Sequence, residues 1–195
     1  MRFLNHGLYT VSLIGDSHQP KLLIFFVSYF YPLFLFIHFI IEEIKELSNE
    51  GYKEITLLGQ NVNSYGHDLD DGSNFATLIR EIAKIDGTYW VRFMTSHPKD
   101  ASRKLIDVMA QGQHIARRFH LPMQSGNDRV LKAMNRHYDM EKYLDTVRYM
   151  REKMPDVVIT SDIIVGFPGE TEAEFEDTLK ALETVRFDML YSFIY

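Results

Sequence analysis

The chain has 195 residues, of which 46% are hydrophobic, and this is enough for one core of ordinary size. Its formal net charge is −6, which excludes a global basic field that would attract nucleic acid, so no DNA partner is expected. The chain contains no cysteine, which excludes disulfides, thiolate metal ligands and cysteine nucleophiles within it.

The N-terminal segment, residues 1–39, differs in composition from the rest. Residues 1–41 hold 7 of the 14 phenylalanines, and their only charged residues are Arg2, Asp16 and Lys21. The 20 residues from 22 to 41 carry no charge. A run of this length can cross a bilayer as a helix. We expect residues 22–41 to be helical and to pack little against the rest of the chain.

Two interpretations of this segment stay open. Arg2 and Lys21 precede the uncharged run, and Glu42 and Glu43 follow it. The positive-inside rule would then keep the N-terminus in the cytosol and place residues 42–195 outside, which argues against a functional membrane anchor. No small-residue cleavage site follows the run, which argues against a signal peptide. We therefore predict a cytoplasmic protein whose residues 1–39 are foreign to the next domain, as after a misplaced start. The alternative is membrane association through residues 22–41.

From residue 40 onward, helices and strands are expected to alternate. The helices have apolar residues at helical spacing, the strands are short apolar runs, and Thr171 with Glu174 forms a capping box. In chain order we expect helix 40–47, strand 54–58, helix 75–85, strand 90–94, a helix around 105–109, strand 118–123, helices 127–135 and 138–154, strand 157–165, helix 171–185 and strand 187–195.

Strand and helix thus alternate about five times at spacings near 30 residues. This pattern predicts an α/β fold with five parallel strands, right-handed crossovers and helices on the outer face, curled toward a barrel. Residues 40–195 would form an incomplete parallel half-barrel. Its strand at residues 54–58 is expected to lie at an exposed edge.

Polar residues and glycines follow the predicted strands, where parallel folds collect their functional groups. They are Gln60, Asn61 and Asn63, then Ser96 and His97, then Gln124 and Ser125, then Gly166 and Gly169. Asp162 lies inside a strand, which is unusual for a charge. Each group has an ordinary explanation as a turn, a loop residue or an N-cap. Together, at four successive strand ends, they predict one shared mouth.

Four segments resemble a known family. They are LLGQNVNSY at 57–65, RFMTSHPKD at 92–100, HLPMQSGNDRVLKAMNR at 120–136 and SDIIVGFPGET at 161–171. Over residues 40–195 the chain is similar to the radical S-adenosylmethionine methylthiotransferases, above all to those that modify N6-isopentenyladenosine in tRNA. The resemblance implies a radical barrel, S-adenosylmethionine, a [4Fe–4S] cluster and tRNA as substrate.

The resemblance also implies what each residue would do. Gln124 and Ser125 would approach the methionine or ribose of S-adenosylmethionine. Gly166 and Gly169 would pass close to the adenine, since glycine lets backbone approach a flat ligand. The weaker candidates at the mouth are Ser96, His97, Asp162, Gln60 and Asn61.

The same family holds its cluster on a Cys-x3-Cys-x2-Cys loop before the helix at Ile40, leaving one iron open for S-adenosylmethionine. This chain has the phenylalanine-rich segment there and no cysteine. The resemblance therefore implies part of a tRNA methylthiotransferase that is inactive with this sequence. Two alternatives stay open: a membrane-tethered, non-enzymatic binding or regulatory module, and an enzyme whose cysteines come from a separate chain.

Overall fold

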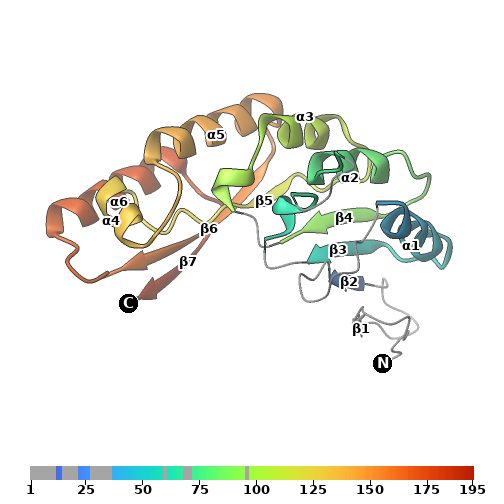
Figure 1. Cartoon of the computed structure of the whole chain (residues 1–195), viewed down its shortest axis with the longest axis horizontal. Helices are drawn as coiled ribbons and strands as arrows, with labels where there is room; N and C mark the ends of the chain where they lie inside the picture. Colours follow the sequence, from blue (N-terminus) through green and yellow to red (C-terminus); the bar gives the residue numbers. More distant parts are fainter. Residues whose placement is uncertain (1–11, 15–21, 27–36, 59–60, 68–71, 95–96) are drawn as a thin grey trace. The chain divides into compact units, whose positions relative to one another are not determined.

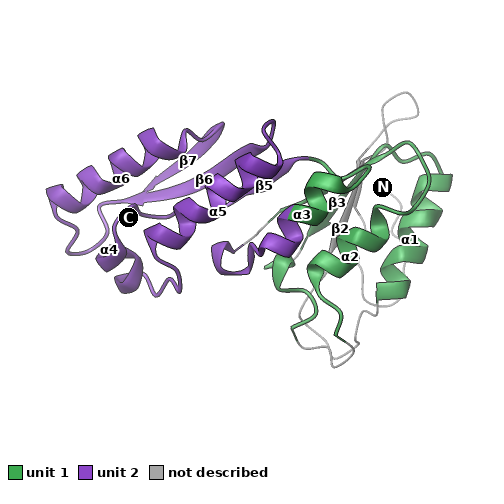
Figure 2. Ribbon diagram, turned by 90° about the horizontal axis from the view of Figure 1, so that it is seen from above, with its two compact units in different colours: residues 1–95, 107–116 green, residues 96–106, 117–195 purple. Residues whose placement is uncertain are grey.

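The computed structural model describes residues 12–14, 22–26, 37–58, 61–67, 72–94 and 97–195. The chain divides into two compact units (Figure 2). Unit 1 comprises residues 1–95 and 107–116, and unit 2 comprises residues 96–106 and 117–195. Each unit contains its own sheet.

The sheet of unit 1 has four strands in the order β1-β2-β3-β4. They are β1 (Ser12–Ile14), β2 (Leu22–Phe26), β3 (Glu54–Leu58) and β4 (Trp90–Phe93). Strands β2, β3 and β4 are parallel, and β1 is antiparallel to β2. An isolated parallel bridge also joins Val91 to Ile115.

Two helices bury their apolar stripes in unit 1. Helix α1 (Ile37–Asn49) buries Ile40, Ile44 and Leu47, and α2 (Phe75–Ile82) begins at Asn74, whose side chain caps Thr77 N. Both helices have the spacing of three and four residues between buried positions that places side chains on one face. A short 3₁₀ helix, η1 (Val62–Ser64), precedes α2, and α3 (Arg103–Gln111) runs across the boundary between the units.

The N-terminal prediction is wrong at residues 22–26. These residues form β2, whose Leu22–Phe26 pairs in parallel with Glu54–Leu58, so the expected continuous helix over 22–41 does not form. The edge position predicted for β3 is wrong for the same reason, because β3 lies between β2 and β4. Without β2, the edge of β3 would leave backbone N–H and C=O groups unpaired. Residues 22–26, which are Leu, Ile and Phe, have side chains suited to a strand that pairs along this edge.

No helix among the described residues has the length and apolar character needed to cross a membrane. Of residues 22–41, the structure describes β2 and the first turns of α1. Residues 27–36, between these two elements, lie outside the described residues.

The sheet of unit 2 has three parallel strands in the order β5-β6-β7. They are β5 (Arg118–His120), β6 (Val158–Val165) and β7 (Met189–Ile194). The helices are α4 (Asp128–Ala133), α5 (Met140–Lys153) and α6 (Glu172–Val185), preceded by the 3₁₀ helix η2 (Pro98–Asp100). Figure 1 shows α4, α5 and α6 on one side of this sheet.

The core of unit 2 lies between the sheet and these helices. Phe119 of β5 and Ile159 of β6 are fully buried, as is Met150 of α5. Tyr143 is also buried, and its hydroxyl donates to the carbonyl of Leu121 at 2.7 Å. Each of the five strands β3 to β7 pairs in parallel with a neighbour in its sheet, which confirms the prediction of parallel strands. The capping box of Thr171 and Glu174 is confirmed as well.

Candidate functional site

The segment after β5 runs beside β6 until Gln124. Leu121 N donates to Thr160 O, Gln124 N donates to Asp162 O, and Ile164 N donates to Gln124 O, at 2.8 to 2.9 Å. Gln124 is 7% exposed and has a φ of 66°, in the left-handed region that side chains other than glycine rarely adopt. Such a conformation costs about 1–2 kcal/mol and persists only where the surroundings impose it.

The side chains of Tyr138 and Ser161 hold this segment in place. The Tyr138 hydroxyl donates to the carbonyls of Pro122 and Met123, at 3.1 and 3.0 Å, and burial raises its pKa. Met123 N donates to the Ser161 hydroxyl at 2.8 Å. The position of Gln124 is therefore fixed by side chains from two neighbouring elements, as a binding site requires.

Ser125 faces the protein interior. It is fully buried, and its hydroxyl accepts from Asn127 N at 3.2 Å and lies 3.4 Å from the Thr178 hydroxyl of α6. Gly126 N donates to the same Thr178 hydroxyl at 2.9 Å. These contacts fix the turn that starts α4, and Asn127 is the N-cap of that helix. The structure thus gives Ser125 a positioning role.

The second turn of the site follows β6. Gly166 and Gly169 have φ values of +73° and +79°, and a Cβ on either would meet no atom within 4 Å. Their backbone is therefore left-handed and borders open space, into which a flat ligand can come close. Asp162, inside the same strand, supplies the carbonyl that accepts from Gln124 N, so the two turns are neighbours.

Glu170 holds the glycine turn together and was missed by the sequence analysis. Its Oε2 accepts from Gly166 N at 2.7 Å and from Phe167 N at 3.2 Å. Its Oε1 is buried and has no hydrogen-bond partner among the described residues. An unpaired buried carboxylate oxygen is costly, so this atom is a candidate acceptor for a ligand. An acidic residue directly after a Gly-x-x-Gly turn was the available signal.

Arg129 of α4 links the two turns. Its guanidinium donates to Gly169 O at 2.7 Å and makes a two-point ion pair with Glu174, the N3 residue of the α6 capping box. The pair joins residues 45 positions apart in the chain. Arg129 thus holds the Gly166–Gly169 backbone against α4 and α6.

Asp162 is paired with His120 on the neighbouring strand. His120 Nε2 lies 3.4 Å from Asp162 Oδ2, and its Nδ1 lies 2.9 Å from the Thr160 hydroxyl. The contact with His120 gives the Asp162 carboxylate a polar partner inside β6, so no ligand is needed to explain a charged residue in this strand. His120 is a second residue that the sequence analysis did not select as a site residue.

The remaining predicted residues fall into three groups. His97 belongs to unit 2, where its Nδ1 accepts from Lys99 N and its ring makes a T-shaped contact with the Tyr138 ring, with 5.7 Å between the ring centroids. Burial lowers the pKa of His97. Asn61, which directly precedes η1, belongs to unit 1, and its side-chain amide donates to the hydroxyl of Ser64, the last residue of η1. Gln60 and Ser96 lie outside the described residues. The structure thus brings together Gln124, Ser125, Asp162, Gly166 and Gly169.

The site can be compared with the cofactors implied by the resemblance. A [4Fe–4S] cluster does not fit, because the chain has no cysteine and the described residues contain no group of three metal-binding side chains. S-adenosylmethionine does fit, since the open backbone at Gly166 and Gly169 and the unpaired Glu170 Oε1 suit a flat, polar ligand.

The ion pair of Glu174 with Arg129 should make the thermal stability of the chain depend on pH. The Arg129 guanidinium and the Thr171 N–H hold its pKa at about 2, well below its usual 4.5. This stabilisation is present above pH 4.5 and is lost as the pH falls toward 2. Glu174→Gln should lower the melting temperature by about 2–4 °C at pH 7, and the difference from the native chain should disappear near pH 2.

Glu172→Gln is the matched control, since it removes a charge from the same helical turn without touching Arg129. Thermal melts of the three chains between pH 2 and 7 measure both effects. Equal losses in the two variants would show that the helix dipole, and not the Arg129 pair, carries the stabilisation.

Comparison with known proteins identifies the family. The sequence pattern of the Radical SAM superfamily matches residues 26–182. The chain is 55% identical over 156 residues to a tRNA-2-methylthio-N(6)-dimethylallyladenosine synthase of Acetivibrio thermocellus, which covers 80% of this chain and 32% of that protein. The synthases of Alkaliphilus oremlandii and Clostridium perfringens are 53% and 54% identical over the same share of this chain. They are covered to 33% and 35% of their own lengths.

Solved structures give the same fold. Coproporphyrinogen III oxidase from Escherichia coli, a radical SAM enzyme, matches 85% of this chain with a TM-score of 0.57 at 16% identity, over 38% of its own length. The cobalamin-dependent S-adenosylmethionine radical enzyme OxsB matches 75% with the same TM-score at 13% identity, over 22% of its own length. The chain spans about a third of the length of its curated relatives. Its similarity to these synthases confirms the predicted resemblance to tRNA methylthiotransferases. The chain belongs to the radical SAM superfamily.

Proposed function

We propose that this chain is the S-adenosylmethionine-holding part of the barrel of a cytoplasmic tRNA methylthiotransferase. The observation that carries the proposal is the pair of neighbouring turns at Gln124 and Gly166–Glu170, which Arg129 ties together. These two turns belong to a chain that is 53–55% identical to synthases named for 2-methylthio-N(6)-dimethylallyladenosine in tRNA. By that likeness, tRNA would be the substrate of the whole enzyme.

In this proposal each of the two turns contacts a different part of S-adenosylmethionine. The open backbone at Gly166 and Gly169 receives the adenine ring, and Glu170 offers its unpaired Oε1 to a polar hydrogen of the ligand. Gln124 faces the methionine or ribose part. Ser125 acts indirectly, because its hydroxyl contacts Thr178 of α6 and accepts from Asn127 N, which holds the turn after Gln124 against α6. Bound S-adenosylmethionine would supply the group that reacts, and these residues would orient it.

Asp162 and His97 have a supporting place in the proposal. Asp162 anchors Gln124 through its carbonyl, while its carboxylate pairs with His120. His97 packs on Tyr138, whose hydroxyl fixes the carbonyls just before Gln124. Gln60, Asn61 and Ser96 remain candidates from the sequence and the resemblance alone.

The chain with this sequence should have no radical activity. Reconstitution with iron and sulfide under anaerobic conditions should leave it without stoichiometric iron, without cluster absorbance and without 5′-deoxyadenosine from S-adenosylmethionine, because three thiolates are missing. A full-length relative treated in parallel is the positive control. Stoichiometric iron on the pure chain, together with cleavage of S-adenosylmethionine, would refute this prediction of inactivity.

A further inference from the structure

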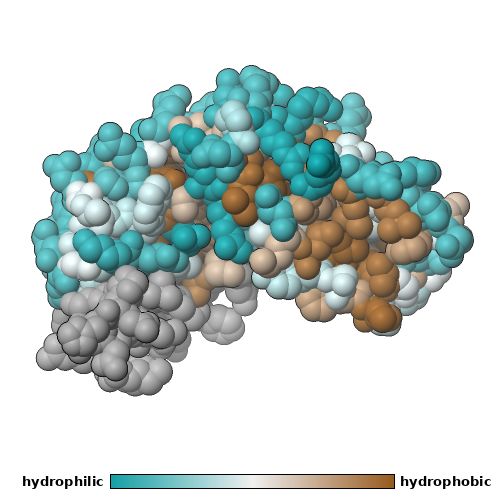
Figure 3. Space-filling model, turned by 180° about the vertical axis from the view of Figure 1, so that it is seen from behind, coloured by the Kyte–Doolittle hydropathy of each residue, from teal (hydrophilic) through white to brown (hydrophobic). Residues whose placement is uncertain are grey.

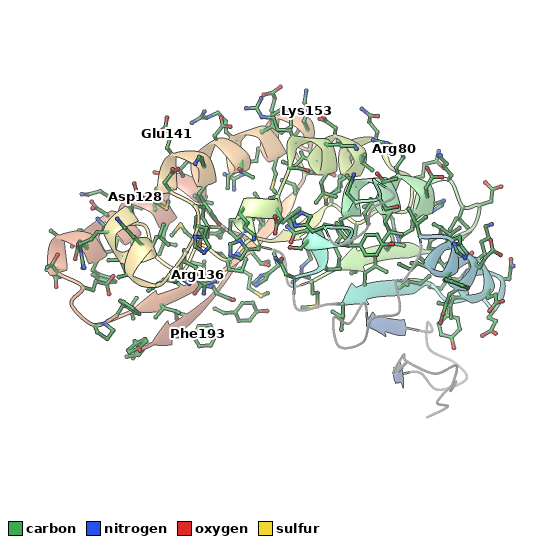
Figure 4. The ribbon with its side chains drawn as sticks, viewed as in Figure 1. Arg80, Asp128, Arg136, Glu141, Lys153 and Phe193 are labelled. Carbon is green, nitrogen blue, oxygen red and sulfur yellow. The ribbon has the colours of Figure 1, made fainter. Side chains whose placement is uncertain are left out.

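A polar cluster lies on the side of the unit 2 sheet that faces away from α4, α5 and α6. Figure 4 shows Phe193 on this side of β7. Phe193 pairs in register with Ile164, and Asp162 lies two residues before Ile164 on β6, so alternation along the strand places Asp162 on the same side. Thr160, two residues earlier, pairs in register with His120 of β5. The side chains of His120, Thr160 and Asp162 therefore share this side of the sheet.

Contacts with three neighbours fix the imidazole ring of His120. Its Nε2 lies 3.4 Å from Asp162 Oδ2, and its Nδ1 lies 2.9 Å from the Thr160 hydroxyl. The Tyr191 ring makes a T-shaped contact with it, with 6.4 Å between the ring centroids. A carboxylate beside Nε2 favours the form of histidine that carries its proton there, so that Nδ1 accepts from the Thr160 hydroxyl. His120 is thus oriented with Nε2–H toward the Asp162 carboxylate.

The Asp162 carboxylate keeps most of its capacity to bind a partner. An ionised carboxylate has about four acceptor positions, and His120 takes one of them. Among the residues that the structure describes, no other side chain makes an ion pair or hydrogen bond with this carboxylate. Ile164 and Phe193 share its side of the sheet, and Figure 3 shows hydrophobic residues gathered at the right of the view, in unit 2. Opposite charges attract more strongly in apolar surroundings than in water, so the carboxylate suits a cationic group.

Asp162 is a direct neighbour of Gln124. Gln124 N donates to Asp162 O at 2.8 Å, and an isolated parallel bridge joins Gln124 to Ile163. In the proposed function, Gln124 faces the methionine or ribose part of S-adenosylmethionine. The sulfonium sulfur is bonded to both of these parts and carries a positive charge. A ligand held by Gln124 in this way would bring its sulfonium close to the Asp162 carboxylate.

We propose that His120 is a positioning residue, which holds the Asp162 carboxylate beside the sulfonium of S-adenosylmethionine. The interaction is electrostatic, and no bond forms or breaks. This inference rests on the proposed function and deepens it, because it assigns the recognition of the ligand's positive charge to one pair of residues. S-adenosylhomocysteine keeps the adenine, ribose and amino-acid groups but has a neutral thioether. Sinefungin carries an ammonium group in place of the sulfonium, so the two analogues separate the effect of charge from that of the methyl group.

Isothermal titration of the full chain with these three ligands tests the inference. The native chain should bind S-adenosylmethionine and sinefungin about tenfold more tightly than S-adenosylhomocysteine. Asp162→Asn should reduce this preference to about twofold or less, because it removes the charge. His120→Gln should keep the preference, since its amide nitrogen can take the place of Nε2 and donate to Asp162. His120→Asn should lose it, since its shorter side chain reaches only the place of Nδ1, beside Thr160.

Glu141→Gln is the matched control, because it removes a negative charge from the side of α5 that points away from the sheet (Figure 4), and it should keep the full preference. Circular dichroism checks that every variant is folded. If His120→Asn weakens all three ligands by the same factor, His120 only maintains the strands, and the inference is overturned. An unchanged preference in Asp162→Asn, or a native chain that binds all three ligands equally, would overturn it while leaving the proposed function intact. A native chain that binds none of the three would overturn the proposed function, and the inference with it.

Discussion

Replacing Gly126 with alanine should lower the free energy of unfolding by about 3 kcal/mol. A Cβ at this position would lie 2.5 Å from Thr178 Cα and 2.7 Å from Asp177 O, both backbone atoms of α6. Backbone cannot rotate away as a flexible side chain can, so the turn and α6 must separate. Gly126 N would then lose its hydrogen bond to the Thr178 hydroxyl.

Urea unfolding followed by circular dichroism measures the loss, and hydrogen exchange of α4 and α6 locates it. Gly166→Ala is the matched control in the same unit. Its Cβ would meet nothing within 4 Å, and its φ of +73° alone should cost about 1 kcal/mol. Equal losses in the two variants would mean that α6 does not press on the turn as the structure has it.

The prediction of unit 2 from sequence was close because its elements are locally encoded. Glu174 follows Thr171 by three residues, and the capping box they form marks the start of α6. The alternation of strands and helices also predicted that β5, β6 and β7 pair in parallel, as β3 and β4 do in the sheet of unit 1. These signals need only neighbouring residues, so no tertiary contact had to be known.

The N-terminal strand could not be predicted in this way. Residues 22–26 are uniformly apolar, and a run without periodicity fits a strand as well as a helix. The choice depended on the unpaired edge of β3, which is about 30 residues away in the chain. The predicted edge position of β3 was wrong as a result of the same missing contact.

The site shows the same division. Gln124 and the Gly166–Gly169 turn were selected because they follow strands, and that information is local. The left-handed backbone of Gln124 and the tie from Arg129 to Gly169 were not predicted. Both arise from contacts between elements about 40 residues apart, and the close approach of Thr178 to Gly126 joins residues 52 apart.

Restoring three cysteines should restore cleavage of S-adenosylmethionine. Strand β2 lies parallel beside β3, and the resemblance places the Cys-x3-Cys-x2-Cys loop after such a strand and before the helix that is α1. A chimera whose residues 1–39 are replaced by the first strand and three-cysteine loop of a relative should therefore bind iron and sulfide. The amount of 5′-deoxyadenosine it forms should exceed that of the present chain at least tenfold, since the latter lacks every cluster ligand.

Within this chimera, Gln124→Ala should reduce cleavage about tenfold, the effect of one lost polar contact of about 1.4 kcal/mol. Lys142→Ala, on the exposed face of α5, should leave cleavage unchanged while iron content stays equal in both variants. Methylthiolation of tRNA should not return, because by the resemblance it needs a second cluster and an RNA-binding domain, and a chain of charge −6 has little affinity for phosphate. Equal losses in the two variants, or none in either, would show that Gln124 does not face the ligand. A chimera that binds a full cluster without cleaving S-adenosylmethionine would show that the turns at Gln124 and Gly166 do not hold this molecule.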